Sequence, residues 1–112
     1  MVEISQQIFN DALKASGNET LAKEFAEAYA EVPNLATRPK NDELLQLYAL
    51  SKQALQNPPF EKKEEPSSWA FQEHAKWKAW KKVYEEGVSP ADAQKQYIAL
   101  VKELKQKYGM KA

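Results

Sequence analysis

Residues 44–55 read LLQLYALSKQAL, and their apolar side chains recur at the spacing of an α-helix. One side of that helix would carry Leu44, Leu47, Tyr48, Ser51 and Leu55. Asn41 is expected to cap its start, because an asparagine side chain accepts hydrogen bonds from the free backbone N–H groups there. The pair Pro58-Pro59 is expected to follow its end, since proline disfavours helix both at itself and at the residue before it. The stretch therefore predicts one amphipathic helix with clear boundaries.

Three further segments show the same helical spacing. Their apolar stripes run over residues 21–32, 71–83 and 90–108. Pro33 is expected to end the first of these helices. Ser89 is expected to cap the last one, because it is a serine followed by a proline at the first helical position. No stretch alternates between apolar and polar residues as a half-buried strand would. The chain is therefore predicted to be all-α.

Residues 1–17 precede these helices and are interpreted as an N-terminal extension to a domain over residues 18–112. Its apolar positions are spaced for one more amphipathic helix and comprise Ile4, Ile8, Phe9, Ala12 and Leu13. The run Ser16-Gly17-Asn18 would end that helix. A helix this short is marginal alone in water, so it either docks on the body or frays.

Composition is that of an ordinary globular protein. Of the 112 residues, 43% are hydrophobic and 29% are charged, which suits a single domain. Lys plus Arg and Asp plus Glu both number 16, and this neutral balance argues against a nucleic-acid partner. The balance breaks locally in a basic cluster of His74, Lys76, Lys78, Lys81 and Lys82. A neutral protein with one basic cluster fits a small anion better than a polyanion.

The chain has no cysteine, which excludes disulfides and is compatible with a reducing compartment. No run approaches the roughly 20 apolar residues of a transmembrane helix, so no insertion into a membrane is expected. Residues 1–7 are too polar to begin a signal peptide. We therefore expect a cytoplasmic protein.

Residues suited to catalysis are scarce. The lone histidine, His74, lies in a polar stretch and is expected to be an ordinary surface residue. No second histidine or cysteine is available to build a metal site or an activated nucleophile. The three glycines are not clustered, so a glycine-rich phosphate loop is missing. We therefore expect no enzymatic activity, no metal and no cofactor.

Two lysines stand beside aromatic residues on predicted helices. Tyr48 and Lys52 are four residues apart and share one helix face, while Lys76 precedes Trp77 and Trp80. A ring next to an ammonium group suits a flat anionic ligand such as a nucleotide with phosphates. The alternative is a core tyrosine with a solvated lysine, and a pair of core tryptophans. At least one of the tryptophans is expected in the core.

From about residue 21 to residue 108, the chain resembles the acyl-CoA-binding protein family. The most specific signal is a Tyr-x-x-x-Lys-Gln-Ala run followed by a Lys-Trp-x-x-Trp run. The matching landmarks are Arg38-Pro39, Leu47-Tyr48, Ser51-Lys52-Gln53-Ala54, Ala75-Lys76-Trp77, Ala79-Trp80, Ala93, Tyr97-Ile98 and Lys107-Tyr108-Gly109. The resemblance implies a four-helix bundle with up-down-down-up topology and a ligand bowl on its surface.

Carried over by position, the ligand-binding residues of the family fall on Tyr48, Lys52, Lys76 and Tyr97. The resemblance implies that the two lysines engage the 3′-phosphate region of CoA, that aromatic residues hold the adenine, and that the acyl chain lies in an apolar groove. It implies non-catalytic binding of medium- to long-chain acyl-CoA esters by an intracellular carrier and pool former. Acyl-CoA-using enzymes would receive the cargo, and we expect a monomer.

Two departures from the family pattern leave another function open. Many members have a tyrosine where this chain has Ser51, and a lysine where it has Pro33. The losses motivate an alternative, in which the chain is a helical protein-interaction module that no longer binds the ligand. A third alternative, an enzyme acting on CoA thioesters, lacks a candidate nucleophile.

Overall fold

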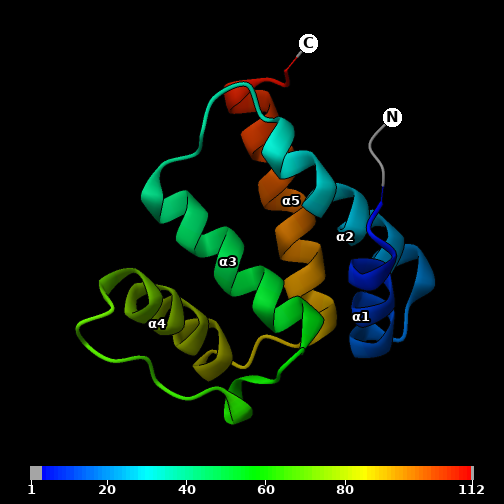
Figure 1. Ribbon diagram of the computed structural model, residues 1–112. Coiled ribbons are helices and arrows are strands. Elements are labelled where there is room, and N and C mark those ends of the chain that lie inside the picture. The colour runs from blue at the N-terminus through cyan, green and yellow to red at the C-terminus, as the bar shows by residue number, and fades with distance from the viewer. Residues whose placement is uncertain (1–3, 112) are drawn as a thin grey trace.

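Residues 4–111 are described by a computed structural model in which helices predominate (Figure 1). The five α-helices are α1 (Gln6–Ser16), α2 (Glu19–Glu31), α3 (Asn41–Leu55), α4 (Phe71–Glu85) and α5 (Pro90–Tyr108). Two 3-10 turns, Val32–Asn34 and Phe60–Lys62, interrupt the connections. Residues 1–3 of the predicted extension and residue 112 of the predicted domain lie outside the described residues.

Helices α2, α3, α4 and α5 run up, down, down and up, as Figure 1 shows. The all-α bundle predicted from the sequence is confirmed, and so is the additional helix at the N-terminus. Within residues 4–111 the β-structure amounts to an isolated bridge between Leu35 and Met110, which ties the end of α2 to the end of α5. None of the helices in this range is both long and apolar enough to cross a bilayer.

Local capping explains where the helices begin. The Ser89 side chain accepts a hydrogen bond from the backbone N–H of Asp92 at 3.1 Å, and Pro90 occupies the first turn of α5. The prediction that Asn41 caps α3 is wrong, because Asn41 is already helical and Lys40 is the capping residue. The Glu43 carboxylate accepts a hydrogen bond from the Lys40 backbone N–H at 2.8 Å. A side chain in the first turn of α3 thus satisfies the backbone donor of the capping residue.

The core lies where α2, α3 and α5 meet, and α4 packs on the outer side of α3. The largest fully buried side chains are Trp80, Phe25, Leu104, Gln94 and Val101. Trp80 confirms that a tryptophan of the Lys-Trp-x-x-Trp run serves the core. Its indole N–H donates to Oε1 of Gln53 at 3.0 Å, and this hydrogen bond anchors α4 on α3.

The N-terminal helix α1 docks on the bundle, so the frayed alternative is wrong. Ala12 is fully buried, and Ile8, Phe9 and Leu13 pack against the core. The buried Gln94 amide donates to the backbone carbonyls of Ala12 at 2.9 Å and of Ala54 at 3.1 Å. One side chain of α5 therefore joins α1 to α3. The division of the chain between residues 17 and 18 stays a prediction.

The carboxylate of Glu43 links α3 to the end of α5. It accepts hydrogen bonds from the Tyr108 hydroxyl at 2.6 Å and from the Lys107 amine at 2.9 Å. These bonds, that of Tyr108 first, and the Lys40 backbone N–H lower the pKa of Glu43 to about 2. Because the pKa is lowered in the folded protein, the ionised Glu43 carboxylate stabilises the fold. This stabilisation is complete above the ordinary pKa of 4.5 and is lost as the pH falls through about 2.

We therefore expect Glu43→Gln to lower the urea midpoint at neutral pH, with the difference from wild type shrinking between pH 4.5 and about 2. The measurement is urea unfolding followed by circular dichroism across this pH range. Glu103→Gln, at an exposed position of α5, is the matched control. A difference that stays constant down to pH 2 would contradict the expectation.

Candidate functional site

A surface groove of about 400 Å³ opens where α2, α3, α4 and α5 come together. We call it the aromatic groove, and it is lined by Tyr29, Val32, Pro33, Arg38, Leu44, Leu47, Tyr48, Ser51, Lys76 and Tyr97. Three of the four predicted binding residues, Tyr48, Lys76 and Tyr97, are among them. Lys52 is absent from that lining, but its amine lies beside the ring of Tyr48, which is part of the lining.

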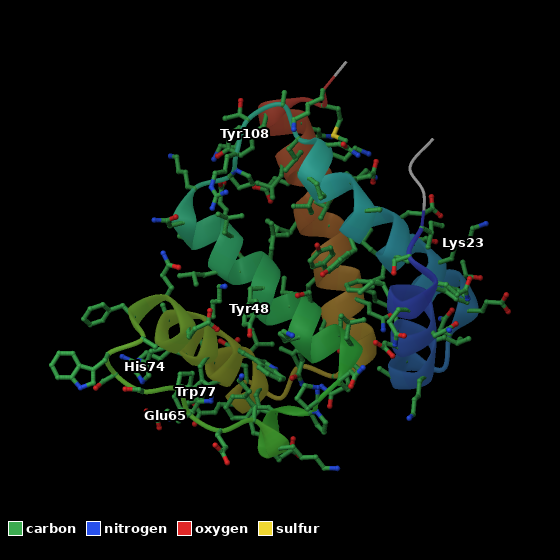
Figure 2. All side chains as sticks on the ribbon, viewed as in Figure 1. Lys23, Tyr48, Glu65, His74, Trp77 and Tyr108 are labelled. Carbon is green, nitrogen blue, oxygen red and sulfur yellow. The ribbon has the colours of Figure 1, made fainter. Side chains whose placement is uncertain are left out.

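Tyr48 stands between the two predicted lysines. The Lys52 amine lies 5.6 Å from the centre of the Tyr48 ring, and the Lys76 amine lies 5.5 Å from it. The two amines therefore come from α3 and α4 to the same ring, and their separation cannot exceed the sum of those distances. Figure 2 shows Tyr48 pointing from α3 into the space beside α4. Two cations beside one ring are chemically suited to a phosphorylated group.

The charges at this site favour an anion. Among the described residues that line the aromatic groove, Arg38 and Lys76 carry charge, and both are cations. The Lys76 amine forms an ion pair with the carboxylate of Glu73 on the same helix, with 3.5 Å between nitrogen and oxygen. Burial, followed by the charge of Glu73, raises the pKa of Tyr48, so its phenol stays neutral at physiological pH.

Tyr97 lines the aromatic groove but is almost fully buried. Its ring is 3% exposed and packs against Phe25, with 4.9 Å between ring centres, and against Tyr29 at 6.1 Å. Burial, followed by the neighbouring Tyr29, raises the pKa of Tyr97 far above its ordinary value. Tyr97 thus forms the floor of the aromatic groove and offers a bound molecule very little of its ring.

Tyr29 and Arg38 line the aromatic groove but were not among the predicted binding residues. Tyr29 falls within the apolar stripe of residues 21–32, and such a position is usually buried, yet 38% of it is exposed. Arg38 lies in the link between α2 and α3, where helical spacing gives no information. The Arg38-Pro39 landmark could have pointed to Arg38 as a lining residue. No feature of the sequence pointed to Tyr29.

A second groove, of about 340 Å³, adjoins the first between α3 and α4. We call it the apolar groove, and its lining consists of Arg38, Asn41, Leu44, Leu45, Phe71, Gln72, Ala75 and Lys76. Arg38, Leu44 and Lys76 line both grooves. The site therefore has a cationic, aromatic part that continues into a part lined half by leucine, phenylalanine and alanine side chains and half by polar or charged ones.

His74 differs from its predicted surface position. Its side chain is 18% exposed, bonds to the Glu65 carboxylate at 3.0 Å, and stacks on Trp77 with ring centres 5.7 Å apart. The three side chains lie together on the outer side of α4 in Figure 2. The loop before α4 folds back onto the helix and covers the imidazole, which sequence spacing does not indicate. Among the described residues, no group of histidine, cysteine and acidic side chains could hold a metal.

Comparisons with known proteins show which family the chain is similar to. Residues 22–101 match the family model described as "Acyl CoA binding protein". The chain is 45% identical over 85 residues to acyl-CoA-binding protein homolog 1 of Caenorhabditis elegans, covering 76% of this chain and 94% of that protein. It is 44% identical over 84 residues to the acyl-CoA-binding protein of Saccharomyces cerevisiae, covering 75% and 92%.

The fold is also similar to a solved structure. The crystal structure of acyl-CoA-binding protein 2 from Oryza sativa superposes with a TM-score of 0.69 at 34% sequence identity. The match covers 78% of this chain and 92% of that one.

Proposed function

This chain belongs to the acyl-CoA-binding protein family, and on that premise we propose that it binds acyl-CoA esters and carries them unchanged. The observation that supports this most directly is the convergence of the Lys52 and Lys76 amines on the ring of Tyr48. A CoA head combines phosphates with a flat base, and this arrangement offers cations beside a ring.

We propose that the phosphates of CoA bind to Lys52, Lys76 and Arg38. An ammonium group is a compact charge suited to phosphate, and a guanidinium binds phosphate with two parallel hydrogen bonds. The three cations come from α3, α4 and the link before α3, so a correctly folded bundle is needed to bring them together.

We propose that the acyl chain lies in the apolar groove between α3 and α4. This groove adjoins the cationic part at Lys76, so one ligand can occupy both. Each methylene removed from water contributes about 0.8 kcal/mol. Longer chains therefore bind more tightly until the groove is full.

No activated nucleophile faces either groove among their lining residues, and we propose a carrier and pool former for medium- to long-chain acyl-CoA esters rather than an enzyme. Acyl-CoA-using enzymes would receive the cargo. We propose that the protein acts as a cytoplasmic monomer. The family match supports ligand binding over the helical interaction module that the sequence left open.

The test is calorimetric titration of the full chain with saturated acyl-CoA esters from C8 to C20. We expect one ligand per chain, and an affinity that rises about fourfold per methylene before it levels off. The thioester should remain intact after incubation, as followed by chromatography. Absence of heat at every chain length would refute ligand binding and favour the interaction module, and loss of thioester would refute the carrier.

A further inference from the structure

The aromatic ring most open to a bound molecule in the aromatic groove belongs to α2. Tyr29 is 38% exposed, whereas Tyr97 beneath it is 3% exposed. The two rings are stacked, with centres 6.1 Å apart and planes inclined by 24°. In this stack Tyr97 is the covered ring and Tyr29 the solvent-facing one.

The Tyr29 ring is supported from behind. Besides Tyr97, the buried ring of Phe25 lies 6.1 Å from it on the same helix. Phe25 and Tyr97 also pack on each other at 4.9 Å, so three rings brace one another. A ring braced in this way loses little conformational freedom when a ligand stacks on it, which favours binding.

Ser51 leaves the side of the groove on α3 without an aromatic group. Its hydroxyl donates to the backbone carbonyl of Tyr48 at 2.8 Å and is thereby engaged by its own helix. Ser51 and Pro33 both line the groove with small side chains that lack a charge. A flat group entering this part of the groove therefore meets Tyr29 as its principal exposed ring.

We infer that Tyr29 is a ligand-binding residue whose exposed ring stacks on the adenine of a bound CoA head, extending the stack of Tyr97 and Tyr29 by one ring. The inference rests on the proposed function, and it moves the aromatic contact predicted for Tyr97 to Tyr29. Stacking between a base and an aromatic side chain is favourable and needs no particular hydrogen-bond pattern.

The inference is tested with Tyr29→Leu, which keeps an apolar side chain and removes the aromatic face. Calorimetry with palmitoyl-CoA is expected to show about a 5- to 150-fold loss of affinity. Tyr29→Phe restores the ring and is expected to recover most of that loss. Trp69→Leu removes an aromatic ring that is 85% exposed and lies outside both groove linings, so its affinity is expected to equal that of wild type.

A direct readout separates ligand contact from a purely structural role. In the wild-type complex, nuclear Overhauser effects are expected between the Tyr29 ring protons and H2 or H8 of adenine. Unchanged affinity in Tyr29→Leu, or weakened affinity without these effects in wild type, would overturn the inference and leave the proposed function standing. If wild type itself fails to bind palmitoyl-CoA, the proposed function fails first.

Discussion

Replacing Lys52 and Lys76 together with methionine is expected to weaken palmitoyl-CoA binding by more than either single replacement, by about 100-fold. A hydrogen bond to a charged group contributes about 1.5 to 3 kcal/mol, so each single variant should lose roughly 10- to 150-fold. Methionine keeps much of the apolar stem of lysine and removes the amine. Both amines approach the Tyr48 ring, so the losses need not be additive. Calorimetry of the two single variants and the double variant measures them.

Lys23→Met is the control for the lysine variants. Lys23 is an exposed residue of α2 that lies at the right-hand edge of the molecule in Figure 2, away from Tyr48 near its centre. The affinity of Lys23→Met for palmitoyl-CoA should match that of wild type, and its melting temperature should match that of the double variant. Wild-type binding should also weaken as salt is added, whereas the double variant should respond less. Affinity unchanged in both single variants would remove the two lysines from the site.

Truncating the buried tryptophan with Trp80→Ala is expected to destabilise the protein by about 3 to 5 kcal/mol. The side chain is 1% exposed, and its removal leaves a cavity between α3 and α4. Oε1 of Gln53 also loses the indole donor that it accepts at 3.0 Å. Because α4 carries Lys76, the variant should bind palmitoyl-CoA more weakly at temperatures where α4 is loosened. Urea unfolding measures the first effect and calorimetry the second.

Trp69→Ala is the matched control for Trp80→Ala. Trp69 precedes the same helix, and 85% of it is exposed. Its replacement should change the free energy of unfolding by no more than about 0.5 kcal/mol. Equal urea midpoints for the two tryptophan variants would show that the anchoring of α4 does not depend on Trp80.

The helices could be predicted from the sequence because their determinants are local. Apolar spacing identifies α2 and α3, and the serine and proline at positions 89 and 90 mark the start of α5. The wrong cap at Asn41 was also a local matter, because the sequence does not show which of the neighbouring residues begins α3. The carboxylate of Glu43 resolved that choice by accepting the Lys40 backbone N–H.

The candidate site was predicted in part. The resemblance selected Tyr48, Lys52 and Lys76, and the structure brings these three together. Tyr97 was selected too, but its ring is covered by Tyr29. Both tyrosines lie on apolar stripes, and a stripe does not tell which member sits at the edge of the core. The partial burial of His74 was not predicted either, because it depends on the loop before α4 folding back onto the helix.

The sequence alone thus establishes that the chain is all-α, from the helical spacing of its apolar residues and from its capping residues. It also shows that basic residues stand beside aromatic ones. Both features depend on neighbours within a few positions of the chain. Packing between helices settles the rest. It docks α1 through Gln94, covers Tyr97 with Tyr29, and brings the Lys76 amine of α4 to the Tyr48 ring of α3. Those contacts join residues far apart in sequence, and burial of the shared core sets their geometry.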